Sequence, residues 1–190
     1  MIEGKECYVV LGHLMCSSGE LDIESKERVD KLVDHIKNKK NQFIFFCGWD
    51  YREDSNIKLA KALNDYFLKR NNHPHYFFQS DCSRDTVGDA VLLKYKYDNV
   101  IKNMKINVFT TDYHKKRSKE IFEFIFNNNN IEVHSSKTKS SVDTKKHEIE
   151  SLNAFKKNFK GIESGNIKKI YQTLITSHPY YNGKVYSKLD

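Results

Sequence analysis

INVFTTDYHKKR, residues 106–117, passes from an apolar run through a polar turn into a helical pattern. Its first six residues are mostly β-branched or aromatic, which is typical of a strand covered on both faces. Residues 115–127 then place Ile121, Phe122 and Ile125 at helical spacing. A buried strand followed at once by an amphipathic helix is the repeating unit of a parallel sheet. This stretch therefore predicts an α/β fold.

The same strand-and-helix unit recurs along the first 136 residues. Further strands are predicted at 7–12, 42–48, 75–79 and 131–135, and further helices at 22–39, 55–70 and 85–101. Alternation of this kind is typical of a sheet with helices on both faces. We predict an open parallel five-stranded sheet in a Rossmann-like three-layer α/β/α arrangement.

Three segments are predicted along the chain. Residues 1–136 form the α/β domain, and the polar residues 137–146 form a linker. Residues 147–190 form a helical C-terminal extension packed on the core, with helices at 147–159 and 166–175. Two roles are open for HPYYN at 178–182. It folds back over the site, or it covers an apolar face of the core, which we favour.

Composition favours a globular domain. The chain has 190 residues, of which 38% are hydrophobic, so it can bury a substantial core. The formal net charge of +7 suits anionic partners, but the lysines are scattered and no nucleic-acid-binding motif accompanies them. We expect a small anionic metabolite rather than nucleic acid as the partner, and a monomer or a homodimer.

Four cysteines occur without a C-x-x-C pair, and the first residues lack the pattern of a secretory signal. No segment reaches the apolar length that spans a bilayer. We therefore expect a cytoplasmic protein with reduced thiols. The cysteine and histidine spacing fits no zinc motif, so no metal is predicted.

Candidate site residues follow the predicted strands. In open parallel sheets, ligands bind at the carboxyl edge, near the point where strand order reverses. Neither G-x-G-x-x-G, the P-loop nor G-x-S-x-G occurs in the chain. The candidates at this edge are Gly12, His13, Gly48, Trp49, Ser83, Arg84, Thr86, Asp89, Thr110, Thr111, Asp112, Tyr113, His114 and Arg117.

SRDTVGDA, residues 83–90, allows two interpretations. Ser83 or Asp85 can cap the helix that follows. The same helix end presents N–H groups and a positive dipole, so Ser83 and Thr86 can also form an anion cradle. Gly88 inside a helix costs about 1 kcal/mol relative to alanine. That cost indicates close approach of another backbone or of a ligand.

TTDYHKKR, residues 110–117, also allows two interpretations. Thr111 or Asp112 can cap a helix whose cations are simply solvated. Alternatively, His114 and Arg117 lie three residues apart on one helical face and hold an oxyanion. In that case His114 or Asp112 serves as the acid–base group.

These motifs, in order, resemble those of the YdcF/SanA/ElyC family. The resemblance covers roughly residues 6–134 and rests mainly on TTDYHKKR and SRDTVGDA. It implies a Rossmann-like fold with a polar pocket and a role in bacterial cell-envelope polysaccharide metabolism. It also suggests S-adenosylmethionine as a ligand. The chain departs from the family pattern at Gly88-Asp89, where E-N is usual, and at Cys47-Gly48-Trp49, where S-G-G is usual.

We expect an enzyme that hydrolyses or transfers a phosphate ester of a nucleotide- or sugar-type metabolite. Trp49 can stack on a base or sugar ring, although a lone tryptophan is more often part of the core. The alternative is a non-catalytic sensor that binds a nucleotide-like metabolite such as S-adenosylmethionine. A basic nucleic-acid-binding module is the third possibility, and its affinity would fall steeply with salt.

Overall fold

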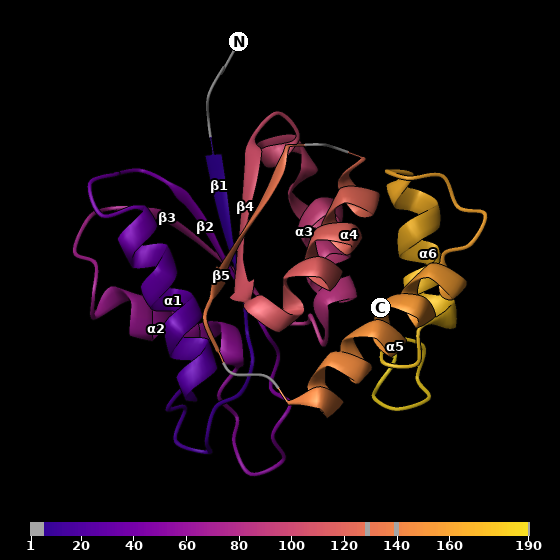
Figure 1. Ribbon diagram of the computed structural model, residues 1–190, viewed down its shortest axis with the longest axis horizontal. Coiled ribbons are helices and arrows are strands. Elements are labelled where there is room, and N and C mark those ends of the chain that lie inside the picture. The colour runs from indigo at the N-terminus through magenta and orange to yellow at the C-terminus, as the bar shows by residue number, and fades with distance from the viewer. Residues whose placement is uncertain (1–5, 128–129, 139–140, 190) are drawn as a thin grey trace.

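The computed structural model describes residues 6–127, 130–138 and 141–189. At its centre lies a sheet of five parallel strands in the order β3-β2-β1-β4-β5 (Figure 1). The predicted open parallel five-stranded sheet is confirmed. Its strands are β1 (Glu6–Leu11), β2 (Phe43–Cys47), β3 (Tyr76–Ser80), β4 (Lys105–Thr111) and β5 (Ile131–Ser136).

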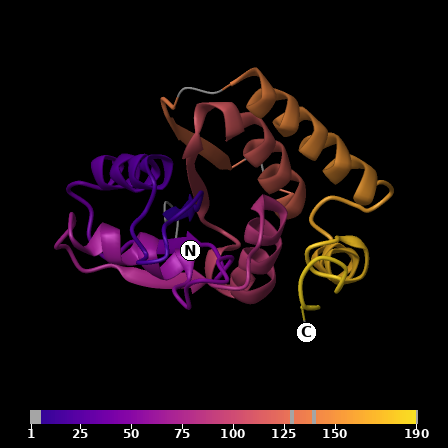
Figure 2. The ribbon, with the colours of Figure 1, turned by 90° about the horizontal axis from the view of Figure 1, so that it is seen from below.

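Two pairs of helices cover the sheet and complete the three-layer α/β/α arrangement. Figures 1 and 2 show α1 (Ile23–His35) and α2 (Leu59–Leu68) on one face, and α3 (Thr86–Ile101) and α4 (Lys115–Phe126) on the other. The side chains of β1 point alternately to the two faces of the sheet, because successive side chains of a strand lie on opposite sides. Tyr8 and Val10 belong to the core under α1 and α2. Cys7 and Val9 belong to the core under α3 and α4.

The C-terminal extension adds a further layer outside α3 and α4. Helices α5 (Val142–Asn158) and α6 (Ile167–Ser177) lie on the side of α4 and α3 that faces away from the sheet (Figure 2). Phe155 packs edge-on against Phe124 of α4, with ring centroids 5.5 Å apart. Ile170 and Leu174 of α6 are fully buried. The extension therefore packs on the core.

The predicted linker 137–146 is wrong in its second half, because α5 begins at Val142. Ser141 caps the helix, and its hydroxyl accepts a hydrogen bond from the Thr144 amide at 3.0 Å. The first turn of α5 is exposed, so its polar composition resembles that of a loop. The other helices agree with prediction within four residues at each end. Residues 1–5, 128–129, 139–140 and 190, which the predicted segments include, lie outside the described residues.

A three-residue 3₁₀ turn, η1 (Asp112–His114), links β4 to α4. None of the helices in the described ranges is both long and apolar enough to cross a bilayer.

Strand order places a crevice beside β1. The chain runs from β1 outward to β3 and then crosses to β4 on the opposite side of β1. The loops after β1 and β4 therefore lead to helices on opposite faces of the sheet, which leaves an opening between them. This is the topological switch point, and the residues after Leu11 and Thr111 border it.

Candidate functional site

A cavity of about 510 Å³ lies at the carboxyl edge of the sheet. It takes lining residues from the loops after four strands and also from α5 and the C-terminal tail. The predicted site residues that line it are Gly12, His13, Gly48, Trp49, Arg84, Thr86, Asp89, Tyr113, His114 and Arg117. The structure thus brings most of the candidates together around one space of ligand size.

A hydroxyl, an imidazole and a carboxylate lie in series in this cavity. Thr86 Oγ1 is 2.9 Å from His114 Nε2. On the other side of the ring, His114 Nδ1 is 2.7 Å from Glu148 Oε2 of α5. Thr86 is the first residue of α3, and His114 ends η1. Two strand ends and the extension together therefore build the series.

Burial sets the protonation of this series. It lowers the pKa of His114 to about 4, because desolvation and the nearby Arg117 charge outweigh the attraction of Glu148. Glu148 is also partly buried, but hydrogen bonds from His114 and Arg117 lower its pKa to about 2. At neutral pH the imidazole is neutral and Glu148 is ionised. Nδ1–H then donates to Glu148, and Nε2 accepts from the Thr86 hydroxyl.

Arg117, which was predicted to hold an oxyanion with His114, is paired with Glu148 in the structure. Its Nε donates to Glu148 Oε2 at 2.8 Å, and its Nη2 donates to Glu148 Oε1 at 2.9 Å. This two-point contact fixes the carboxylate and neutralises the guanidinium. In this arrangement Arg117 positions Glu148, and an anionic ligand would have to displace that side chain to reach it.

Arg28 of α1 joins the two strand ends at the switch point. Its Nη1 donates to the Leu11 and Gly12 carbonyls at 3.0 and 2.8 Å, and its Nη2 donates to Thr111 Oγ1 at 3.1 Å. The residue is only 2% exposed, yet it lines the cavity. Its Nε has no hydrogen-bond partner among the described residues. Arg28 therefore brings a buried positive charge to the site, and Glu24, whose Oε2 lies 3.6 Å from Nη2, balances part of it.

Asp89 is a buried carboxyl group one helical turn after Thr86. It is 6% exposed and lines the cavity. Burial raises the pKa of Asp89 to about 7 against the opposing effects of Ser83, Arg28 and Arg117, and the Asp85 charge adds to the rise. A carboxyl group that titrates near neutral pH can either give or take a proton in catalysis.

Tyr181 occupies the amino end of α3, where the sequence predicted an anion cradle. Its hydroxyl oxygen accepts from the Arg84 and Asp85 amides at 2.6 and 3.2 Å, and its O–H donates to Asp85 Oδ1 at 3.0 Å. Asp85 caps the helix by accepting from the Gly88 amide at 2.9 Å. Three of the amides at this helix end, those of Arg84, Asp85 and Gly88, are therefore already bonded within the chain.

Gly88 is needed for that arrangement. A Cβ on Gly88 would lie 1.8 Å from Tyr181 Oη. The predicted close approach to Gly88 is therefore confirmed, and the approaching group is a side chain of the tail rather than a backbone or a ligand.

The tail takes both of the roles that the sequence left open. Tyr181 is fully buried in the core, whereas Tyr180 and Tyr186 line the cavity. Tyr186 lies edge-on to Trp49, with ring centroids 4.5 Å apart. The favoured interpretation, that HPYYN only covers an apolar face, was incomplete. Tyr181 of this segment is buried in the core, but its neighbour Tyr180 lines the cavity.

Arg84 is held against this aromatic group. Its Nη1 donates to the Tyr180 carbonyl and to the Ser187 carbonyl, the latter at 2.7 Å. The guanidinium carbon lies 5.1 Å from the centre of the Trp49 ring and 5.7 Å from that of Tyr186. Trp49 is half-buried and belongs to the site rather than to the core.

Four predicted residues do not line the cavity. Ser83 is buried and donates to the Ser80 carbonyl at 2.8 Å. Thr110 is buried, and its hydroxyl has no partner among the described residues. Thr111 accepts from Arg28, so it does not cap η1 with its side chain. Asp112 is exposed and accepts from the Ser135 hydroxyl.

Asp112 is therefore misplaced as an acid–base group. The side chain of a residue directly after a strand can point to either side of the turn, and Asp112 lies at the surface beside β5. Gly12 and Gly48 line the cavity with backbone alone. A Cβ on Gly12 would lie 2.4 Å from Leu59 Cδ2, so that turn requires glycine. His13 is engaged by Asp22, with Nδ1 2.5 Å from Oδ2.

Sequence reasoning missed Arg28, Glu148 and Tyr186, and it named Tyr180 and Tyr181 only as part of HPYYN, without a role for either side chain. The signal for Tyr181 was the helical Gly88, which pointed to a close neighbour without naming it. Arg28 adjoins Val29 on the buried side of α1, and a cation at a core-facing position is itself a signal of a buried polar site. Glu148 carried no local signal, because it lies among exposed charged residues.

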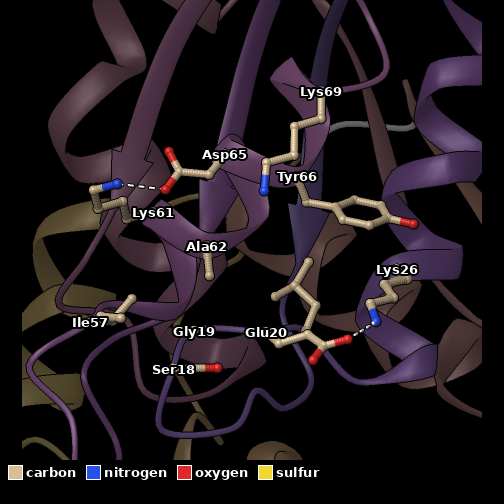
Figure 3. Close-up of a pocket in the computed structure, with 11 residues that line it drawn as sticks. Ser18, Gly19, Glu20, Lys26, Ile57, Lys61, Ala62, Asp65, Tyr66 and Lys69 are labelled. Atoms are coloured by element: carbon tan, nitrogen blue, oxygen red, sulfur yellow. Dashed lines mark hydrogen bonds and ion pairs between the residues drawn. The ribbon is translucent and has the colours of Figure 1, made fainter.

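A second cavity, of about 310 Å³, lies beside α2 (Figure 3). Lys61 pairs with Asp65 at 2.5 Å, and Lys26 pairs with Glu20 at 2.8 Å, so these charges are matched within the wall. No predicted site residue lines it. Within the described ranges, no cluster of three or more His, Cys, Asp or Glu side chains has the spacing of a metal site.

Comparison with family models, with characterised proteins and with solved structures finds no match to this chain. The resemblance to the YdcF/SanA/ElyC family therefore stays a prediction.

Proposed function

We propose that the chain hydrolyses or transfers the phosphate ester of a small nucleotide- or sugar-type metabolite, with Thr86 as the nucleophile. One observation carries the proposal: Thr86, His114 and Glu148 are in series at 2.9 and 2.7 Å in a cavity bordered by arginines. A hydroxyl next to a neutral imidazole that a carboxylate orients is the arrangement that activates an alcohol for attack.

The first step transfers the phosphoryl group to the protein. Thr86 Oγ1 forms a bond to phosphorus, the bond from phosphorus to the leaving oxygen breaks, and His114 Nε2 takes the threonine proton. Glu148 stabilises the imidazolium that results. Asp89 in its neutral form donates a proton to the leaving oxygen, which departs as an alcohol.

The second step regenerates the protein. Water, or an acceptor alcohol in a transferase, attacks the phosphothreonine and gives a proton to the Asp89 carboxylate. The bond from phosphorus to Thr86 breaks, and the proton held on His114 returns to Oγ1. Both groups thus end in their starting states, and the products are phosphate or a new phosphate ester.

Charge in the cavity supports an anionic ligand. Three arginines line it, namely Arg28, Arg84 and Arg117, against the carboxylates of Asp85 and Glu148. Asp89 adds no charge while it is protonated, which its pKa of about 7 permits up to neutral pH. The lining residues then carry one net positive charge, which Glu24 beside Arg28 offsets in part, and this local charge supports a phosphate over a neutral ligand.

Substitution of Thr86 tests the proposal. We expect Thr86→Ala to lower kcat toward p-nitrophenyl phosphate and a panel of phosphate monoesters by at least about a hundred-fold. Thr86→Ser keeps a hydroxyl and should retain measurable turnover. Thr110→Val is the matched control, because Thr110 is a buried threonine whose hydroxyl has no partner among the described residues and does not line the cavity. Equal kcat in wild type and Thr86→Ala would rule out the proposed nucleophile.

A non-catalytic sensor of a nucleotide-like metabolite such as S-adenosylmethionine is the second candidate. The observation in its favour is that two of the predicted anion contacts are already made within the chain. Tyr181 accepts a hydrogen bond at the amino end of α3, and Glu148 accepts the hydrogen bonds of Arg117. Saturable binding of such a ligand with no turnover of any ester in the panel would favour the sensor. A place in cell-envelope polysaccharide metabolism rests on the family resemblance alone.

A further inference from the structure

One wall of the cavity is aromatic, and the C-terminal tail supplies most of it. Tyr180 and Tyr186 line the cavity together with Trp49 from the loop after β2. The rings of Tyr180 and Tyr186 are 5.4 Å apart, and that of Tyr186 is 4.5 Å from Trp49. Each of the two tail tyrosines remains 37% exposed. Part of each tyrosine ring is thus accessible at the cavity.

We infer that this wall binds a planar heteroaromatic ring of the substrate, so that the substrate is of the nucleotide class. The inference rests on the proposed function, because it takes the phosphate of the same molecule to lie beside Thr86. It goes further by choosing a base-bearing phosphate ester over a simple sugar phosphate.

Arg84 provides the argument for a flat ring. Its Nη1 already donates to two tail carbonyls, and its Nη2 lies 3.3 Å from the Ser187 hydroxyl. Three of its five N–H groups are thus committed in the plane of the guanidinium. Nε–H has no partner among the described residues but is buried, which leaves one N–H of Nη2 to bond sugar hydroxyls. The guanidinium carbon lies 5.1 Å from the centre of the Trp49 ring and 5.7 Å from that of Tyr186, so the cation is part of the aromatic wall and favours a further electron-rich ring there.

The size of the cavity agrees with such a ligand. Its volume of about 510 Å³ lies within the range of small-molecule sites and has room for a base as well as a phosphate. Thr86 and Trp49 line the same space. A base on the aromatic wall would therefore share one continuous cavity with a phosphate at Thr86.

A binding experiment that needs no turnover tests the inference. Trp49 is the single tryptophan of the chain, so its fluorescence reports on this wall alone. We would titrate full-length Thr86→Ala with adenosine 5′-monophosphate and, separately, with ribose 5-phosphate, which has the same phosphate but no base. Calorimetry gives both dissociation constants, and Trp49 emission shows whether the base reaches the wall.

Adenosine monophosphate should bind about ten-fold more tightly than ribose 5-phosphate and should change Trp49 emission. Tyr186→Ala should weaken the nucleotide about ten-fold and leave the sugar phosphate unchanged, whereas Tyr186→Phe, which keeps the ring, should bind as before. Tyr76→Ala is the control, because Tyr76 is an exposed tyrosine of the edge strand β3 that does not line the cavity.

Equal affinity for the two probes, or a nucleotide affinity that Tyr186→Ala leaves unchanged, would overturn the inference. Tyr180 and Tyr186 would then have only a structural role, as part of the aromatic packing around Trp49. Failure of the phosphoryl chemistry is a separate result, because it is measured as turnover in wild type and Thr86→Ala and not as binding.

Discussion

The α/β core and the C-terminal extension both supply groups to the cavity, but they hold them differently. The core places Thr86 at the start of α3 and His114 at the end of η1, directly after the buried strand β4. The extension reaches the same cavity with single side chains, of which Glu148 and Tyr186 are the main ones. The core thus supplies most of the cavity lining, and the extension supplies the carboxylate beside His114 and the tyrosine ring beside Trp49.

The two regions also differ in how firmly they are packed. Every residue of β1 after Glu6 is buried, whereas only Leu152 and Phe155 of α5 are buried. Burial of apolar area is the main stabilising contribution, so the core should tolerate changes in the extension better than the reverse. The predictions below test this division, from the largest expected effect to the smallest.

Glu148→Gln should have the largest effect in the extension. It removes the charge that orients and stabilises protonated His114, and we expect kcat to fall about a hundred-fold with little change in folding. Steady-state kinetics with circular dichroism as a folding check would measure this. Glu150→Gln, an exposed carboxylate of the same helix, should leave kcat unchanged. A faster Glu148→Gln enzyme would mean that the carboxylate blocks the site.

Gly88→Ala should break the contact between core and tail. The new Cβ meets Tyr181 Oη, and overpacking of this kind lowers the free energy of unfolding by about 1–3 kcal/mol. Urea unfolding of Gly88→Ala, Tyr181→Ala and the double variant would show the coupling. The double variant should lose less than the sum of the single losses. Strict additivity would contradict the contact.

Activity should depend on pH through two groups of the cavity, His114 and Asp89. Because the pKa of His114 is lowered to about 4, kcat/KM should hold to a lower pH than an ordinary histidine allows and fall below about 4. Because the pKa of Asp89 is raised to about 7, kcat/KM should also fall above about 7, as the proton for the leaving group is lost. Asp89→Asn should remove the upper limb. An upper limb that survives in Asp89→Asn would contradict this role.

Stability gives a second test of Asp89. Its folded pKa of about 7 is above its ordinary value of 3.8, so the folded chain binds more protons between these values. The contribution of Asp89 to stability is present below pH 4 and is lost as pH rises through about 7. Unfolding of wild type and Asp89→Asn at several pH values should show a difference that grows over this range in favour of the variant.

Asp112→Asn should have the smallest effect. Asp112 is exposed and does not line the cavity, so we expect kcat and KM within about two-fold of wild type. A large loss of kcat in this variant would restore Asp112 as an acid–base group and would contradict the geometry.

Much of the core could be predicted because its signals are local. Buried strands such as Phe43–Cys47 are short apolar runs, and strand ends of a parallel sheet must meet at one edge. That rule predicts His114, Thr86 and Trp49 at one edge of the sheet, and all three line one cavity there. It could not orient the side chains at the turns, and it therefore included Asp112 and Ser83.

The contribution of the extension to the site could not be predicted in the same way, because it depends on contacts between residues far apart in the sequence. Glu148 lies in an exposed, highly charged helix, and nothing in that pattern separates it from Glu150. Its partner His114 is 34 positions away in sequence, and the packing of α5 on α4 decides the contact. Gly88 was the one local signal of the extension, because a glycine inside a helix indicates a close neighbour, and here that neighbour is Tyr181.

Identification of a phosphorylated residue tests the central claim most directly. Wild type would be mixed with p-nitrophenyl phosphate, quenched in acid during turnover, digested and analysed by peptide mass spectrometry. We predict one added phosphoryl group on Thr86 in wild type and none on that peptide in Thr86→Ala. Turnover with the phosphoryl group on another residue, or persistent turnover in Thr86→Ala, would contradict Thr86 as the nucleophile.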